Sequence, residues 1–333
     1  TTASYTDGVT NNLVIGTEYW YRISAINIVG TGLTSTADST VAGDRPAQIS
    51  VISATAQAGQ EILVAWTAPA DNSYAISSYL IQVSTDQQNW TTAGSSTTTS
   101  FTDTSLGVGV TYYYRAHATN SLGDSDKSGI VNALAGDVPA QTSGLTTTVL
   151  SDTQIRLNWT APVDNAYSIS GYKIERSADN TNWSVLIADT QSTAVVHTDS
   201  GLTAKTDYYY RISAINSLGT GTASTSVIGT TWDVPDAIAD LSGSVSGSDI
   251  VLTWSAPANN GATISKYIFQ VQSVDTGNWI TLDINVQVLT ATHSGISTAI
   301  PNTEISYRVY AVNAIGQSPA SNVEQVWTLP TAP

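Results

Sequence analysis

The sequence predicts an all-β protein, a tandem array of seven-stranded β-sandwiches, and two repeating patterns support that prediction. In the first pattern an Arg is followed five residues later by Asn and eight residues later by Gly, and it occurs four times, at steps of 93, 96 and 97 residues. Apolar and polar residues alternate along it, as in Tyr210-Arg211-Ile212. Because successive side chains of a strand face opposite ways, the alternation predicts a strand with one buried face. The four arginines are Arg22, Arg115, Arg211 and Arg308.

The second pattern occurs upstream of each of the last three of these strands. A Trp is followed three residues later by Pro, then by a turn of Asp and Asn residues, then by Ile-x-x-Tyr and a second Trp. In the first copy these residues are Trp66, Pro69, Ile76, Tyr79 and Trp90. The equivalent residues are Trp159, Pro162, Ile169, Tyr172 and Trp183 in the second copy, and Trp254, Pro257, Ile264, Tyr267 and Trp279 in the third.

In this order the motifs resemble the fibronectin type III family, and the resemblance covers essentially the whole chain. It implies immunoglobulin-like sandwiches in which a Tyr at the start of the arginine strand bonds its hydroxyl back to upstream backbone. Tyr19, Tyr112 and Tyr208 occupy that place, and Ile305 replaces them in the fourth copy. We therefore expect this bond to be missing from the fourth copy, at a cost of about 0.5–1.5 kcal/mol, unless Pro301 compensates.

The repeats divide the chain into residues 1–43, 44–136, 137–232 and 233–333. A unit of this length can bury its own core, so each full repeat is expected to be a domain. Each boundary contains a Pro, which fixes φ and removes a donor. We therefore expect short junctions with limited swing, domains that meet end to end, and an extended array. The boundaries read Gly43-Asp44-Arg45-Pro46, Gly136-Asp137-Val138-Pro139 and Trp232-Asp233-Val234-Pro235.

Within residues 44–136 the pattern predicts seven strands, and the later repeats follow it with small insertions. The seven strands span about 49–55, 61–67, 78–84, 89–93, 98–103, 110–120 and 126–133.

Residues 1–43 carry only the later part of a repeat, with strands expected near residues 4–6, from Tyr19, and near residues 34–42. The Trp-x-x-Pro and Ile-x-x-Tyr strands are missing, so nothing in the sequence covers the apolar face of the Tyr19 strand. At the other end, Trp327-Thr328-Leu329-Pro330 aligns with the boundary that begins at Trp232. We therefore expect the chain to belong to a longer one at both ends. Either upstream residues complete the first sandwich, or a neighbouring chain donates strands to it.

The charge balance argues against nucleic acid and anionic membranes as partners. The chain has 26 acidic and 11 basic residues, a formal net charge of −15, and such a surface repels polyanions. No apolar run is long enough for a membrane span. There is no Cys, and hence neither a disulfide framework nor a Cys-based metal site.

The sequence offers no basis for catalysis, a cofactor or a metal. His117, His197 and His293 lie in three different repeats and are interpreted as solvated surface residues. A triad or metal site needs such residues close together. The Asp71-Asn72 and Asp164-Asn165 loops each supply one carboxylate, whereas calcium needs roughly six to eight oxygens, so they are interpreted as turns.

The candidate binding residues are Trp20, Tyr113 and Tyr209, which occupy the outward position next to the corner Tyr on the arginine strands. Exposed aromatic rings on a sheet can stack on sugar rings, so these positions are candidates for contacts with cell-surface polysaccharide. The alternative is packing against neighbours on the same face, such as Leu80 or Lys173. The fourth copy has Ser306 at this place, which favours the alternative.

The function that these observations predict is a non-catalytic structural and adhesive spacer in a larger extracellular or virion-surface protein. Its Cys-free, Ser- and Thr-rich composition is similar to that of domains on phage fibres, tails or capsids. The expected partners are flanking domains of the same parent chain or neighbouring virion or surface subunits. Two alternatives stay open: an accessory array of a secreted bacterial adhesin, and spacer domains of a polysaccharide-degrading enzyme whose catalytic domain lies outside this chain.

Overall fold

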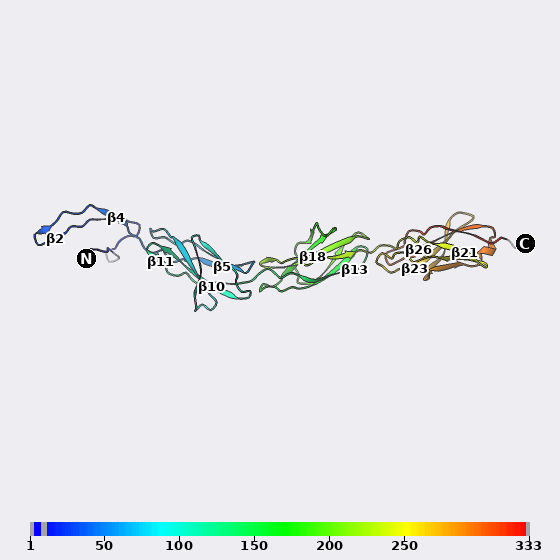
Figure 1. The fold of residues 1–333 in the computed structure, drawn as a ribbon, viewed down its shortest axis with the longest axis horizontal. Helices are drawn as coiled ribbons and strands as arrows, with labels where there is room; N and C mark the ends of the chain where they lie inside the picture. The colour runs from blue at the N-terminus through cyan, green and yellow to red at the C-terminus, as the bar shows by residue number, and fades with distance from the viewer. Residues whose placement is uncertain (1–2, 8–11, 331–333) are drawn as a thin grey trace. The chain divides into compact units, whose positions relative to one another are not determined.

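The protein is described by a computed structural model that covers residues 3–7 and 12–330 (Figure 1). Within those residues it is all-β apart from one four-residue helix. By its contacts the chain divides into two compact units. One comprises Thr1–Ala140, Pro162–Gly171 and Ala214–Thr222; the other comprises Gln141–Ala161, Tyr172–Ser213 and Ala223–Pro333.

The first complete repeat is a sandwich of two antiparallel sheets. The three-stranded sheet has the order β5-β6-β9, formed by β5 (Ile52–Gln57), β6 (Glu61–Trp66) and β9 (Ser100–Asp103). The second sheet has the order β11-β10-β7-β8 with β12 beside β10, formed by β7 (Ser78–Ser84), β8 (Thr91–Ser96), β10 (Thr111–Asn120), β11 (Gly123–Asp124) and β12 (Val131–Leu134). All seven expected strands are present, β7 with the expected ends and the others with shifted ends, and the short β11 is an addition to them.

The second complete repeat has the same two sheets. The order β13-β14-β17 is formed by β13 (Ser143–Val149), β14 (Gln154–Thr160) and β17 (Val196–Ser200). The order β16-β15-β18-β19, with β20 beside β18, is formed by β15 (Gly171–Ser177), β16 (Ser184–Ile187), β18 (Asp207–Asn216), β19 (Gly219–Thr220) and β20 (Val227–Thr230).

The last repeat keeps this plan and adds the helix. Its three-stranded sheet β21-β22-β25 consists of β21 (Ser242–Ser246), β22 (Asp249–Thr253) and β25 (Thr290–His293). Its four-stranded sheet β24-β23-β26-β27 consists of β23 (Lys266–Gln272), β24 (Trp279–Val286), β26 (Glu304–Val312) and β27 (Glu324–Trp327). The helix α1 (Ile296–Ala299) lies in the chain between β25 and β26.

The described residues before Asp44 form two separate strand pairs. β1 (Glu18–Tyr21) pairs with β4 (Asp38–Val41), and β2 (Ile26–Asn27) pairs with β3 (Gly30–Thr31). The strand expected near residues 4–6 is wrong, because residues 3–7 form no strand. A strand there needs a neighbouring strand for its backbone hydrogen bonds, and among residues 3–7 and 12–330 β1 pairs only with β4.

The two aromatic landmarks of each repeat meet in its core. Trp66 packs against Tyr79 with ring centroids 5.1 Å apart, and both are nearly fully buried. The equivalent pairs Trp159–Tyr172 and Trp254–Tyr267 have centroid distances of 5.1 and 5.4 Å. Tilted and edge-on contacts of this kind add to the free energy of area burial. The recurrence of the Trp-x-x-Pro and Ile-x-x-Tyr motifs therefore reflects one packing contact made three times.

The expected tyrosine corner is confirmed. Tyr112 accepts a hydrogen bond at its hydroxyl from the Gly107 backbone N–H at 3.1 Å, and Tyr208 accepts one from Thr203 at 3.0 Å. Tyr19 does the same with Val14 at 3.0 Å. In the last repeat Ile305, which has no hydroxyl, lies 2% exposed in the core.

The helix α1 replaces the corner in the last repeat. Ile296 and Ile300, at its two ends, pack against the core cluster that contains Ile305. Ser297 is fully buried, and its hydroxyl accepts the Leu329 backbone N–H at 3.2 Å. In the last repeat the helix thus packs apolar side chains on the core at the position where the other repeats have the hydrogen bond of the corner Tyr.

The alignment of Trp327 with Trp232 is wrong by two residues. Trp327 pairs with Glu304 in β27, whereas Thr230 pairs with Asp207 in β20. Glu304 and Asp207 both directly precede the corner position, so Trp327 is the counterpart of Thr230. The shared Trp-x-x-Pro motif was therefore a weaker guide to equivalent residues than the pairing of the strands, whose register is specified by the buried face.

Candidate functional site

The recurring Asn of the arginine strand ties three segments of its repeat together. Asn120 donates through Nδ2 to the carbonyls of Asp44, Asp71 and Tyr74, at 2.9, 3.3 and 3.3 Å. Asn216 and Asn313 make the equivalent three bonds at 2.7–3.4 Å. Each Asn is about 95% buried, so its polar groups need these partners. The Asn is therefore structural in every complete repeat.

The predicted aromatic residues do not form one site. Trp20 in β1 is 66% exposed, whereas Tyr113 in β10 and Tyr209 in β18 are half-buried. The residue across from Tyr113 on β7 is Ser84, and Leu80 instead lies opposite His117. The three rings belong to three different repeats. Their contact with polysaccharide stays a prediction.

Each complete repeat has a cation–π stack that was not predicted from the sequence, on the sheet face that carries the predicted aromatic residue in the first two of them. The guanidinium of Arg115 lies 4.1 Å from the ring centroid of Trp90, and that of Arg308 lies 4.1 Å from Trp279. Arg211 stacks on Trp183 at 4.4 Å. Arginine attracted to an indole face stabilises such a pair. The second Trp and the Arg recur in step in the sequence, and that signal could have indicated the pairing.

Each of these arginines also binds a side chain across the sheet. Arg115 donates through Nε to Gln82 Oε1 at 2.8 Å, and Arg308 does the same to Gln270 at 2.8 Å. In the second repeat a carboxylate takes this place, and Arg211 reaches both oxygens of Glu175 at 3.0 and 3.2 Å.

The second repeat thus buries a charge cluster where the others have an amide. Glu175 is 7% exposed and also lies 3.0 Å from Lys173 Nζ. Burial by itself would raise the pKa of Glu175, but its hydrogen bonds to Arg211 and Lys173 and their charges hold that pKa below its ordinary value. A carboxylate held ionised by two cations is a poor proton donor or acceptor near neutral pH, so the cluster is structural.

Buried Tyr–Asp pairs lie on the inner side of the arginine strands. Tyr114 donates to Asp103 Oδ2 at 2.9 Å, and Tyr210 donates to Asp199 Oδ2 at 2.9 Å. Burial and the adjacent carboxylate raise the pKa of Tyr114 far above its ordinary value. The same two causes raise the pKa of Tyr210. These phenols stay protonated, and each hydroxyl is hydrogen-bonded to its carboxylate, so the pairs are structural.

The interpretation of the histidines as solvated is wrong for His117. His117 is 8% exposed, and His197 and His293 are half-buried. His117 Nε2 lies 3.5 Å from Asp124 Oδ2, but its Nδ1 has no hydrogen-bond partner, so no nucleophile is bonded to the ring. Neighbouring side chains can bury a residue that faces outward from a sheet. Strand periodicity shows only which way a residue faces, so it could not predict this burial. Within residues 3–7 and 12–330 no three His, Cys, Asp or Glu side chains are grouped so as to hold a metal.

The Asp–Asn loops are turns. Asn72 and Ser73 both have positive φ, of 51° and 73°, and the Tyr74 N–H binds the Asp71 carbonyl at 3.2 Å. Two successive positive φ values are typical of a type I′ turn. The interpretation of this loop as turn chemistry is therefore confirmed.

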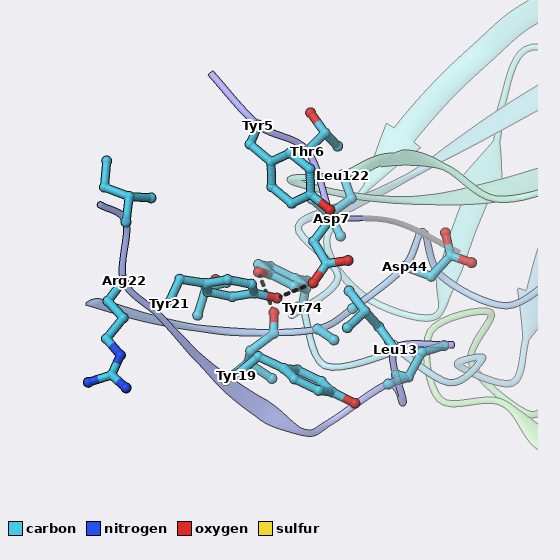
Figure 2. A pocket seen from close by; sticks show the side chains of 16 residues that line it. Tyr5, Thr6, Asp7, Leu13, Tyr19, Tyr21, Arg22, Asp44, Tyr74 and Leu122 are labelled. Carbon is cyan, nitrogen blue, oxygen red and sulfur yellow. Dashed lines mark hydrogen bonds between the residues drawn. The ribbon is translucent and has the colours of Figure 1, made fainter. Parts of the chain in front are cut away.

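A cavity of about 880 Å³ lies beside β1 (Figure 2). It is lined by Tyr5, Asp7, Leu13, Tyr19 and Tyr21, together with residues of the first complete repeat. Figure 2 shows the Tyr21 hydroxyl directed at Asp7, with a hydrogen bond of 3.0 Å to Oδ2.

The lining of this cavity corresponds to the interior of a complete repeat. Tyr21 occupies the strand position of Tyr114, and Asp7 takes the role of Asp103 as its acceptor. Tyr114 is fully buried, whereas Tyr21 is half-buried. The hollow is therefore an uncovered core face and has no grouping of catalytic side chains.

Asn27 shows what the uncovered face lacks. It is the counterpart of Asn120, and its Oδ1 accepts the N–H groups of Val29 and Gly30 as expected. Within residues 3–7 and 12–330 its Nδ2 has none of the three carbonyls that Asn120 binds. Completion by upstream residues or by donated strands stays a prediction.

Comparison with known proteins identifies the repeated unit. The family profile described as "Fibronectin type III domain" matches residues 45–133, 139–230 and 236–327. No helix in the described residues is long and apolar enough to cross a membrane.

Similar proteins have diverse names. Exoglucanase B of Cellulomonas fimi is 25% identical over 296 residues, which is 84% of this chain and 25% of the relative. Fibronectin type-III domain-containing protein 3A of Pongo abelii is 26% identical over 292 residues, 82% of this chain and 24% of the relative. Protein sidekick-2 of Mus musculus is 25% identical over 338 residues, 95% of this chain and 15% of the relative. The chain thus spans a quarter or less of the length of each of these proteins.

A solved structure is also similar. The crystal structure of the FN1–FN3 domains of chicken CNTN1 is 20% identical, and the match covers 85% of this chain and 99% of that one with a TM-score of 0.29.

Proposed function

Because the chain belongs to the fibronectin type III domain family, we propose that it is a non-catalytic spacer and adhesive segment of a larger extracellular or surface protein. One observation carries this proposal. The three complete repeats use the same residues for two internal ties, the buried Asn and the Arg–Trp stack. Those groups are occupied in holding the sandwich together, which suits a module that is repeated for its shape.

A virion-surface protein, such as a phage fibre, tail or capsid appendage, is the setting we favour. The absence of Cys, the low Lys content and the many Ser and Thr residues support it. Repetition also suits weak multivalent binding to cell-surface polysaccharide, because linked weak sites gain avidity without any strong single site.

A second candidate is the spacer region of a polysaccharide-degrading enzyme. The similarity to a protein named exoglucanase, of which the match covers a quarter, favours it. In that setting the catalytic domain lies outside this chain. The accessory array of a bacterial adhesin is a third setting with the same role for these domains.

Two measurements test the proposal. Incubation of the purified chain with soluble and insoluble glucans should release no reducing sugar above buffer, and release that depends on the chain would overturn the non-catalytic role. Binding to a glycan panel should be weak and should fall in a variant in which Trp20, Tyr113 and Tyr209 are all changed to Ala. Equal signals from wild type and variant would remove the aromatic contacts from the proposal and leave the spacer.

A further inference from the structure

The junction in front of each complete repeat pairs an aromatic ring with a glycine, but the two partners change sides. In the first two junctions the glycine is in the linker (Gly43, Gly136) and the ring is in the loop between the second and third strands of the repeat. In the third junction the ring is in the linker, as Trp232, and the glycine is in the loop, as Gly261.

The linker glycines of the first two junctions leave no room for a side chain. A Cβ on Gly43 would lie 2.3 Å from Tyr74 Cδ2, and a Cβ on Gly136 would lie 2.5 Å from Tyr167 Cδ2. The carbonyl oxygens of the same loops would be 2.8 and 2.7 Å away. Neither glycine has a positive φ, so space and not backbone conformation requires glycine there.

The tyrosines of these two junctions reach into the preceding segment. Tyr74 donates its hydroxyl to the Val41 carbonyl at 3.1 Å, and Tyr167 donates to the Leu134 carbonyl at 2.8 Å. Val41 and Leu134 each lie two residues before the linker glycine, in the last strand of the preceding segment. The ring therefore covers the glycine and its hydroxyl binds the strand that leads into it.

The third junction holds its ring from the other side. A Cβ on Gly261 would lie 2.3 Å from Trp232 Cδ1, and the Gly261 φ of +95° favours glycine as well. The main chain of Trp232 is tied to the second repeat, since its N–H binds Ser151 O at 3.3 Å and its carbonyl accepts the Lys205 N–H at 3.3 Å. Ala262, at the place of Tyr74 and Tyr167, is 4% exposed.

We propose that this loop of each repeat is a docking surface for the end of the preceding repeat, and that reciprocal ring–glycine pairing selects the partner. A loop with Tyr accepts a linker with Gly, and a loop with Gly-Ala accepts a linker with Trp. Two rings would compete for one space, and two small residues would leave it empty. The order of neighbouring repeats is thus specified by side-chain volume at the junction.

The test converts the second junction into the third type. Gly136→Trp alone places two rings in one space, which overpacks the junction. Gly136→Trp combined with Ala166→Gly and Tyr167→Ala reproduces the residues of the third junction. The readout is hydrogen exchange at the Asp137 N–H, which binds the Asn165 carbonyl at 3.2 Å in the same junction.

Gly136→Trp alone should speed exchange at Asp137 by about five-fold to a hundred-fold, because overpacking destabilises the local structure that protects this N–H. In the combined variant the exchange rate at Asp137 should return to within about three-fold of wild type. The reason is that the effects of substitutions at residues in contact are not additive, so the second and third changes offset the first. Gly129→Trp is the matched control: nothing lies within 4 Å of a Cβ at Gly129, so exchange at Asp137 should not change.

Exchange in the combined variant that is as fast as in Gly136→Trp alone would overturn the proposal. If Gly136→Trp alone does not fold and the combined variant does, the pairing is supported. If neither folds, the reverse exchange decides: Trp232→Gly should expose the Asp233 N–H, which binds Asn260 O at 3.0 Å, and added Ala262→Tyr should protect it again. Gly261 is kept in this variant, because its φ of +95° would strain any other residue. Failure of that rescue also overturns the proposal.

Discussion

The first complete repeat and the last one build the same sandwich but satisfy its buried tyrosine hydroxyl differently. Tyr114 donates to the carboxylate of Asp103 at 2.9 Å, whereas Tyr307 lies 3.0 Å from Nδ1 of His293. The last repeat also replaces the corner Tyr with Ile305 and the helix α1. The comparison teaches that the apolar framework is common to both repeats and that the polar ties attached to it are exchangeable.

The largest effect should be common to both repeats. Trp66→Ala and Trp254→Ala each remove a ring that is about 95% buried and leave a cavity, so each should lower the free energy of unfolding of its repeat by about 3–5 kcal/mol. Chemical denaturation followed by region-resolved hydrogen exchange measures both. A large loss in one repeat and almost none in the other would break the claim of a common framework.

The tyrosine hydroxyl should separate the two repeats. Tyr114→Phe leaves Asp103 without its donor, and bonds to charged groups are worth about 1.5–3 kcal/mol. Tyr307→Phe removes a bond to a neutral ring and should cost about 0.5–1.5 kcal/mol. The same unfolding measurement compares the two variants, and an equal loss in both would contradict the distinction between the two acceptors.

Acid should destabilise the last repeat through His293. Burial lowers the pKa of His293, so the unfolded chain binds its proton more readily than the folded one. Stability from this group is therefore complete above the unfolded pKa of about 6.5 and is lost as the pH falls below it towards the lower folded pKa. Unfolding of wild type and His293→Gln between pH 7.5 and 5 should show the extra acid sensitivity only in wild type. Identical pH profiles would exclude His293 as its source.

The corner should have an effect as small as that of Tyr307→Phe. Tyr112→Phe removes one hydrogen bond to the Gly107 N–H and keeps the ring, so the first complete repeat should lose about 0.5–1.5 kcal/mol. Tyr208→Phe is the parallel variant in the second repeat and should behave alike. A loss above that range would mean that the hydroxyl does more than cap one backbone group.

Much of the fold could be predicted because its signals are local. Alternation with a period of two marks the strands, and the recurring Trp and Tyr mark the core positions where Trp66 meets Tyr79. The corner hydroxyl of Tyr112 binds a group only five residues away, so its motif contains both partners.

The candidate site was less accessible from the sequence because its partners are distant. Arg115 and Gln82 are 33 residues apart and meet only through the register of β10 on β7. The burial of His117, opposite Leu80 on the same pair of strands, depends on that register too.

The sequence by itself determined the number of repeats, their period and the residues of their cores, because repetition and side-chain alternation are written in consecutive residues. The tertiary structure alone decided which side chains satisfy one another. It placed Trp232 against Gly261 where the other junctions set Tyr against Gly, and it left Tyr21 on an uncovered face. Such outcomes depend on volume and hydrogen bonding between segments that approach each other only after the sheets have formed.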